Sequence, residues 1–237
     1  MRILKGDMAK TMKWILLWLM VVSACAAQTI RPVLSEYRNK AEGRFEVVND
    51  MFTATNVVLE AKGFTVDEGG AIKYVPLPPE IKLKLSDKSF RLAPKAKRTI
   101  TYSATAAQMP AWFVIYADVA GAPVKKTSGL SVQVMLPHTV YILPDKDADR
   151  QELTIASATF DPATKTLALK VTSGSANFAR VELTQVKTND GTLEARGFPV
   201  FPKSTRRIEI QVAGDKVPQK VTLQFGKFEL DADVNRL

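Results

Sequence analysis

Cysteine and histidine are almost missing from this chain, which has one of each among its 237 residues. Zinc sites built on several cysteines, iron–sulfur clusters and disulfide-held scaffolds all need more cysteines than that. A zinc enzyme that holds its metal through two or three histidines is excluded for the same reason. We therefore expect no metal and no cofactor, and a fold that is stabilised by the burial of apolar side chains rather than by cross-links.

Long hydrophobic runs are also scarce, and the single strong one lies near the N-terminus, at residues 14–24. It is too short to span a bilayer, which takes about 20 residues. Basic residues precede it, and Ala24 and Ala26 flank Cys25 after it, which is the pattern of a secretory signal peptide. We predict that residues 1–26 are removed and that the mature chain is exported to the periplasm without a transmembrane segment.

Cys25 allows a second interpretation of the same region. The segment Val22–Cys25 fits a loose lipoprotein box, in which the cysteine becomes the lipidated first residue of the mature protein. Val22 stands where such boxes usually have leucine. If cleavage follows Ala26 instead, the cysteine leaves with the signal peptide.

Positive charge is in moderate excess, with 33 Lys and Arg against 24 Asp and Glu. The basic residues are not interleaved with aromatic ones, so we expect no nucleic-acid binding. Phosphate-binding loops and nucleophile-elbow motifs are absent from the sequence. His138 is the single candidate imidazole base, but it lies inside an apolar strand-like segment, which favours a structural role. We therefore predict a binding protein and not an enzyme.

The chain after residue 26 has the pattern of an all-β protein. Short segments in which apolar and polar residues alternate are separated by turn residues such as Asp67–Gly70 and Asn189–Gly191. The predicted strands are Arg44–Asn49, Val57–Val66, Arg98–Ala104, Trp112–Val119, Leu130–Leu136, Thr166–Thr172, Arg180–Val186, Arg207–Val212 and Val221–Phe228. Such alternation is typical of antiparallel sheets with one buried face.

A charged segment at Pro144–Arg150 divides these strands into two groups. We predict two immunoglobulin-like β-sandwich domains in tandem, at residues 27–144 and 145–237.

The first of these regions resembles the N-terminal domain of the periplasmic pilus chaperones (PapD-like). The resemblance covers roughly residues 30–144. It lies in the order and spacing of five segments: Glu46–Asp50, Val57–Phe64, Phe90–Arg98, Trp112–Tyr116 and Gly129–Pro144. The second region fits this family at the level of an immunoglobulin-like pattern.

The resemblance implies that the protein is a chaperone for fimbrium biogenesis, whose partners are pilus subunits and an outer-membrane usher. Such a chaperone lends an edge strand to a subunit that lacks its last strand. Here Leu130, Val132 and Val134 occupy alternate positions of the corresponding strand, so they are the candidate subunit-binding residues. Alternatively, these three side chains face the core of their own domain.

The sequence also departs from the family pattern. Members of the family hold the terminal carboxylate of the subunit with an Arg and a Lys in the cleft between domains. The Lys position corresponds to Thr139, and Arg31 lies near the Arg position, so Arg31 is the candidate anchor. Pro137 removes a backbone donor from the last strand.

Two other functions fit the same strand pattern. One is a structural or adhesive module of the cell envelope, lipidated at Cys25 or not. The other is a carbohydrate-binding sandwich that uses Trp112, Phe113 or Tyr116, although core packing explains these aromatic residues better.

Overall fold

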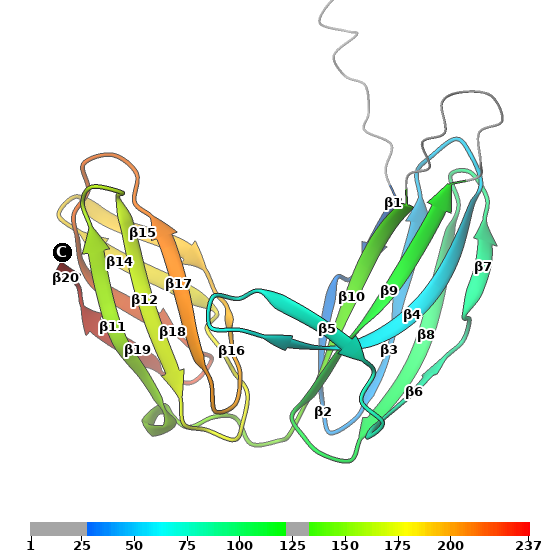
Figure 1. The fold of residues 1–237 in the computed structure, drawn as a ribbon, viewed down its shortest axis with the longest axis horizontal. Helices are drawn as coiled ribbons and strands as arrows, with labels where there is room; N and C mark the ends of the chain where they lie inside the picture. Colours follow the sequence, from blue (N-terminus) through cyan, green and yellow to red (C-terminus); the bar gives the residue numbers. More distant parts are fainter. Residues whose placement is uncertain (1–27, 122–132) are drawn as a thin grey trace, which may run out of the picture.

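The computed structural model describes residues 28–121 and 133–237, which form two β-sandwiches (Figure 1). Residues 144–149, between β10 and the second sandwich, join them, and we call this segment the hinge. The all-β prediction is confirmed: the helical segment in the described ranges is one 3-10 turn, Arg150–Glu152. None of the described residues forms a helix that is long and apolar enough to cross a membrane. The predicted signal peptide, Cys25, Leu130 and Val132 lie outside the described residues.

The first sandwich has a small and a large sheet. The small sheet contains, in spatial order, β1 (Gln28–Arg31), β3 (Ala41–Asn49), β8 (Lys97–Ala106) and β6 (Ile81–Leu85). The large sheet contains β2 (Leu34–Arg38), β10 (Gln133–Leu143), β9 (Ala111–Gly121), β4 (Thr55–Val66) and β5 (Ile72–Pro76), with β7 (Ser89–Leu92) also paired to β4.

The alternation in the sequence decides which side of each strand is buried. Along β4, for example, Val57 and Leu59 are buried while Val58 between them is exposed. The buried residues of both sheets form one core between them, which includes Phe45, Ile100, Phe113, Ile115 and Ile142.

The chain changes sheets between β1 and β2. β1 pairs antiparallel with β3 of the small sheet, and after Pro32 and Val33 the chain runs parallel to β10 of the large sheet as β2. This crossover closes one side of the sandwich.

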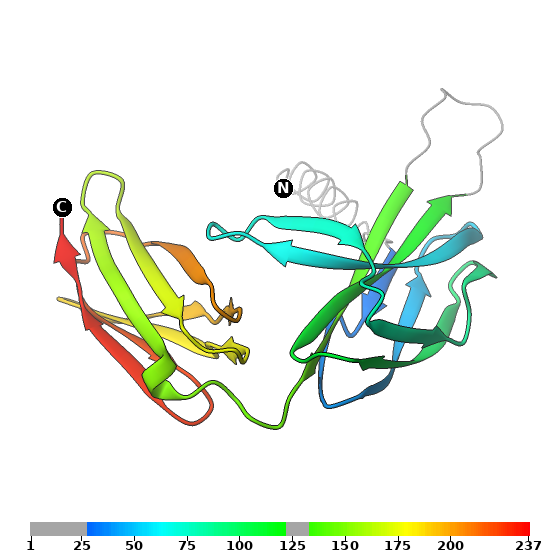
Figure 2. The same ribbon diagram turned by 60° about the horizontal axis from the view of Figure 1, so that its bottom comes forward.

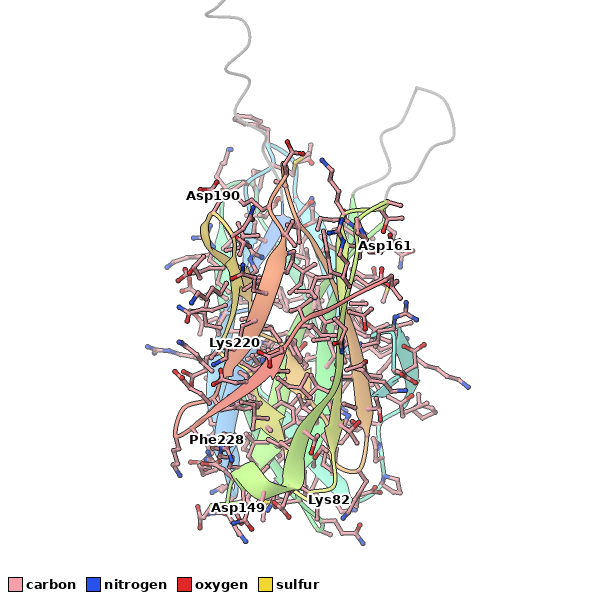
Figure 3. All side chains as sticks on the ribbon, turned by 90° about the vertical axis from the view of Figure 1, so that its left-hand side faces the viewer. Lys82, Asp149, Asp161, Asp190, Lys220 and Phe228 are labelled. Atoms are coloured by element: carbon pink, nitrogen blue, oxygen red, sulfur yellow. The ribbon has the colours of Figure 1, made fainter. Side chains whose placement is uncertain are left out.

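The second sandwich follows the hinge and has two four-stranded sheets. One contains β17 (Thr205–Gln211), β12 (Thr166–Ser173), β11 (Leu153–Asp161) and β20 (Asn235–Arg236). The other contains β15 (Gly191–Arg196), β14 (Leu183–Thr188), β18 (Pro218–Gln224) and β19 (Glu229–Asp233). Figure 3 shows Asp161, at the end of β11, and Asp190, in a turn, at one end of this sandwich, and Asp149 and Phe228 at the other end.

Two predicted strands of this sandwich differ in the structure. The segment predicted at Arg180–Val186 is split into β13 (Ala179–Arg180), which pairs with β16 (Pro199–Val200), and β14. The break occurs because the amide groups of Val181 and Glu182 donate to Phe198 and Gln224, on two different segments. The strand predicted at Val221–Phe228 ends at Gln224, since Phe225 and Phe228 stack on each other in a tight turn.

Candidate functional site

β10 carries the candidate subunit-binding segment, and its two halves have different surroundings. Residues Thr139–Leu143 lie between β2 on one side and β9 on the other. Residues Gln133–His138 pair with β9 alone, as far as the described part of the chain extends. We call Thr139–Leu143 the paired half of β10 and Gln133–His138 its one-sided half.

The backbone groups of the one-sided half can be assigned to its two sides. The amide of Thr139 donates to the carbonyl of Val33 on the β2 side, at 2.7 Å. Backbone groups of alternate residues in an antiparallel strand point the same way, so those of Gln133, Met135 and Pro137 also face away from β9. Proline has no N–H to donate. The free side therefore offers the amides of Gln133 and Met135 and the carbonyls of all three residues.

The side chains of the one-sided half divide between two faces. Leu136 packs against the core of the first sandwich, and Val134 lies on the same side by alternation and is half-buried. Met135 lies on the opposite face of the large sheet, 48% exposed. Of the three predicted subunit-binding residues, Val134 is thus the one that the structure places, at the partly open edge of the core, and the role of all three stays a prediction.

His138 is fully buried, stacked on Phe45 with ring centroids 4.8 Å apart. Its Nδ1 lies 2.7 Å from the carbonyl oxygen of Pro32, which can only accept, so Nδ1 carries the proton. Nε2 then accepts from the hydroxyl of Tyr102 at 2.9 Å, and Tyr102 in turn accepts from Tyr37 at 2.9 Å. Burial lowers the pKa of His138, partly opposed by the Pro32 hydrogen bond.

This network gives His138 a structural task. It joins β10 to the β1–β2 crossover through Pro32, to β8 through Tyr102, and to β2 through Tyr37. Neither partner of the ring is the Ser or Cys nucleophile of a catalytic dyad, and no carboxylate orients the ring as in a triad. The structural role predicted for His138 agrees with this geometry.

The structure does not bring Arg31 and Thr139 together. Arg31 is opposite Glu46 in the small sheet and shares a shallow surface hollow with Arg44 and Thr99. Because Ile30, one residue earlier, points into the core, Arg31 points outward from the small sheet. Thr139 instead lies on the outer face of the large sheet, and its register partner there is Leu34. The anchor role of Arg31 stays a prediction, and its position gives it no support.

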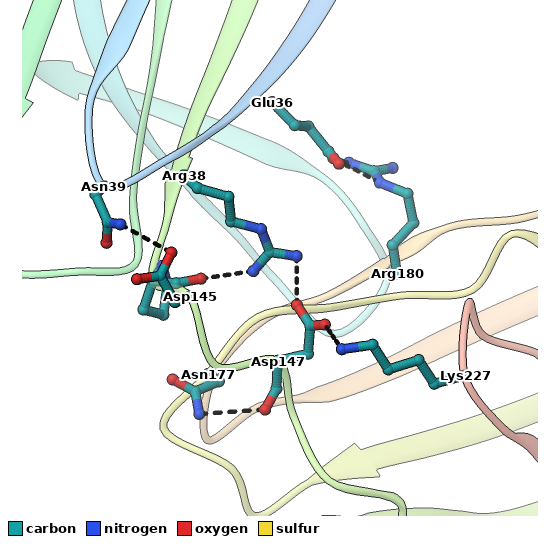
Figure 4. A network of polar contacts seen from close by, with 9 residues as sticks. Glu36, Arg38, Asn39, Asp145, Asp147, Asn177, Arg180 and Lys227 are labelled. Carbon is teal, nitrogen blue, oxygen red and sulfur yellow. Dashed lines mark hydrogen bonds and ion pairs between the residues drawn. The ribbon is translucent and has the colours of Figure 1, made fainter.

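Charged residues at the hinge hold the two sandwiches together (Figure 4). Arg38, at the end of β2, binds the carboxylate of Asp147 and the carbonyl of Pro144. Lys227 binds the same carboxylate at 2.9 Å, and its hydrogen bond, with that of Arg38, lowers the pKa of Asp147. Arg180, from the second sandwich, binds Glu36 of β2 through Nε at 2.7 Å. A cavity of about 610 Å³ beside these pairs is lined by both signs of charge.

Next to these charged residues, aromatic side chains of β9 and β10 pack against aromatic side chains of the second sandwich. Tyr141 of β10 lies 5.0 Å from Phe178, centroid to centroid, and Trp112 of β9 lies 4.9 Å from Phe201. Trp112 also donates to the carbonyl of Phe64 at 2.8 Å. Phe64, Tyr141, Phe178 and Phe201 are buried together with Val114, Tyr116 and Leu143, and Trp112 is partly buried against them.

The hairpin formed by β4 and β5 reaches across to the second sandwich (Figures 1 and 2). At its tip, the carbonyl of Glu68 accepts from the amide of Arg207 on β17 at 2.7 Å. The carboxylate of Glu68 pairs with Lys170 of β12 at 3.1 Å. Gly70 has a φ of +93°, and a Cβ there would lie 2.0 Å from Nη1 of Arg206, so the tip fits closely against β17. Sequence alternation could not predict this contact.

The described side chains contain no cluster of three or more His, Cys, Asp or Glu that could bind a metal. What the arrangement offers is a strand with an open backbone edge, an adjoining partly open core and a second sandwich fixed beside it. These features suit the binding of an extended polypeptide.

No protein-family model matches the chain, and no curated protein matches its sequence. Solved structures, however, match nearly its whole length. They include the class 5 fimbriae chaperone CfaA, with 13% identity, a TM-score of 0.51, and coverage of 89% of this chain and 100% of that one. The YadV chaperone matches with 12% identity, a TM-score of 0.54, and coverage of 87% and 98%.

A chain in the Salmonella enterica complex of SafA pilin with the SafB chaperone matches equally well. The identity is 12%, the TM-score is 0.54, and the coverage is 88% of this chain and 96% of that one. The protein therefore has the two-sandwich fold of fimbrial chaperones. The resemblance seen in the sequence is confirmed at the level of the fold.

Proposed function

We propose that this protein is a periplasmic chaperone that captures pilus subunits by lending them β10, in the course of assembly at an outer-membrane usher. The shared fold supports this proposal, since structures of this fold include complexes such as those of SafB with SafA pilin. The observation that carries it is the one-sided half of β10, which pairs with β9 alone in the described part of the molecule.

An edge of this kind binds a partner strand in two ways. The outward amides of Gln133 and Met135 and the outward carbonyls supply main-chain hydrogen bonds to an added strand. Val134 supplies an apolar side chain that a subunit with an incomplete core can cover, worth about 1.5–3 kcal/mol for a fully buried Val. Val132 and Leu130, two and four residues earlier, continue the same alternation in the sequence.

The carboxylate substitutions Val132→Asp and Val134→Asp, combined in one variant, test this proposal. Burying an unpaired carboxylate in the subunit groove costs several kcal/mol, so the variant should lose subunit capture. The assay is co-expression in a bacterial periplasm with each pilin of the source genome, each without its N-terminal donor segment. Complexes are then quantified after affinity purification and size exclusion.

A matched control separates loss of binding from loss of folding. Leu237, 81% exposed at the far end of the second sandwich, receives the same carboxylate in Leu237→Asp. We expect this control to retain capture, and the double variant to keep the circular dichroism spectrum of the unsubstituted protein. An unfolded double variant would show that the two valines face their own core. Absence of a complex between the unsubstituted protein and any pilin would instead favour a structural module of the envelope.

A further inference from the structure

The face of β10 that looks toward the second sandwich carries a stripe of uncharged side chains. Met135, Pro137 and Thr139 follow one another on this face, at every second residue. Leu34 extends the stripe onto β2, because it is the register partner of Thr139. Met135 is 48% exposed and Leu34 is 42% exposed. We call these four residues the β10 stripe.

The stripe lies on the side that faces the second sandwich, as its neighbours in the same strands show. Two residues after Thr139, Tyr141 packs on Phe178 of the second sandwich. Two residues after Leu34, Glu36 binds Arg180 of the second sandwich. The stripe is therefore continuous with the contact between the sandwiches at one end and with the one-sided half of β10 at the other.

In the described structure, the cations on strands beside the stripe and on the facing sandwich that are named next each already pair with a carboxylate. Lys62, two strands from Thr139 across β9, pairs with Glu60 at 3.0 Å. Arg38 binds Asp147, and Arg180 binds Glu36. Arg31 points outward from the opposite sheet. A carboxylate that came to rest on Leu34 and Thr139 would displace water without gaining a charged partner, which is unfavourable.

We infer that the β10 stripe receives an uncharged, apolar stretch of the captured strand, and that the terminal carboxylate of that strand is not held in the cleft. This inference rests on the proposed function and specifies its partner. The open backbone edge requires an extended strand. The stripe beside that edge is uncharged, and the carboxylate of Asp118 lies opposite Met135 on the same face, so uncharged side chains are favoured there over a second carboxylate.

Binding of two synthetic peptides tests the inference. Both copy the C-terminal strand of a pilin that forms a complex in the capture experiment, one as the free acid and the other as the C-terminal amide. We expect their dissociation constants to agree within about threefold, because a lost charge-assisted hydrogen bond would cost more than tenfold. A free acid that binds at least about tenfold tighter than the amide would overturn the inference.

Substitutions in the stripe give a second readout. Leu34→Asp and Met135→Asp should each weaken binding of both peptides by at least about tenfold, since each buries a new carboxylate against the strand. Both positions are well exposed in the free protein, so the thermal midpoint should not move. Arg31→Ala should leave both affinities unchanged.

The outcomes distinguish this inference from the proposed function. If Val134→Asp leaves capture intact, the donor-strand function itself fails. If Val134→Asp abolishes capture but Leu34→Asp and Met135→Asp do not weaken it, the function stands and the inference is wrong. A loss of affinity in Arg31→Ala that is seen for the free acid alone would also overturn the inference, because Arg31 would then be the anchor.

Discussion

The two halves of β10 belong to one strand and pair with the same neighbour, β9, yet they differ in what lies on their other side. The paired half has β2 there, and its residues Val140 and Ile142 are fully buried. The one-sided half has no hydrogen-bonded strand there in the described structure, and Val134 and Leu136 are only half-buried. The change occurs beside Pro137 and His138. One end of the strand thus stabilises the domain, and the other end is the one that we propose to bind a subunit.

Of the substitutions that test this comparison, a large-to-small change in the core of the paired half should change the free energy of unfolding most. We expect Ile142→Ala to lower the free energy of unfolding by about 2–5 kcal/mol, because the cavity would be enclosed. Val134→Ala, in the one-sided half, should lower it by less than about 1.5 kcal/mol. Urea denaturation followed by fluorescence measures both. Equal losses would mean that the two halves are equally part of the core.

Substituting His138 tests the junction of the two halves. His138→Phe leaves the carbonyl of Pro32 without its donor, and we expect a loss of about 1–3 kcal/mol in the free energy of unfolding near pH 7.5. Burial lowers the pKa of His138 in the folded protein below its ordinary value of 6.5. The unfolded chain therefore binds a proton first, and the unsubstituted protein loses stability as the pH falls below about 6.5.

This pH dependence is measured as a difference between two proteins. The gap in stability between the unsubstituted protein and His138→Phe should narrow on acidification from about pH 6.5 down to the folded-state pKa. Carboxylates that titrate at lower pH affect both proteins alike and cancel in the difference. A gap that stays constant between pH 7.5 and 5 would contradict the assigned burial of the neutral ring.

The hinge pairs lie just beyond the paired half, where Arg38 is the register partner of Leu143. Asp147→Ala frees Arg38 and Lys227 at once, but these groups are partly exposed to solvent. We expect a loss of no more than about 1 kcal/mol in the free energy of unfolding. The loss should shrink when salt is raised to about 1 M, because salt screens such pairs. Calorimetry at two salt concentrations checks this, and a larger loss that is independent of salt would contradict it.

Pro137→Ala should have the smallest effect on stability, within about 0.5 kcal/mol, because the position faces the free side of the strand. It should add one fast-exchanging amide. In hydrogen exchange by NMR, the amides of residues 133, 135 and 137 should exchange faster than those of residues 134 and 136, which face β9. Slow exchange at all five positions would show that the outer side of this half is already paired.

Much of this fold could be predicted because it depends on local alternation. The strands around Phe45, Val57, Ile100 and Phe113 have apolar residues at every second position, and the structure buries those residues. The predicted turn at residues 189–191 likewise connects β14 and β15, where Gly191 has a φ of +95°. These strands are thus determined by residues within a few positions of one another.

The site was less predictable because it depends on contacts between distant segments. The position of Arg31 in the sequence predicted that it lies in the cleft near Thr139. The chain changes sheets at Pro32 and Val33, however, so Arg31 lies in the small sheet and Thr139 in the large one. No period in the sequence signals such a crossover. The partners of His138 are 36 and 106 residues away, so its network could not be read from neighbouring residues either.

The docking of the β4–β5 hairpin has a consequence for how this protein can diverge during evolution. The hairpin tip approaches β17 so closely that any side chain at residue 70 would overlap the guanidinium of Arg206. Gly70 and Arg206 are 136 positions apart in the sequence and lie in different sandwiches. A side chain at residue 70 would displace the flexible guanidinium and would also strain the backbone, because φ there is +93°. In relatives that keep this hairpin, position 70 should stay glycine or become asparagine or aspartate, which tolerate a positive φ best, and such a change should be accompanied by a smaller residue at position 206. Correlated substitutions at these two positions in an alignment would then indicate that the two sandwiches are in contact, without a structure.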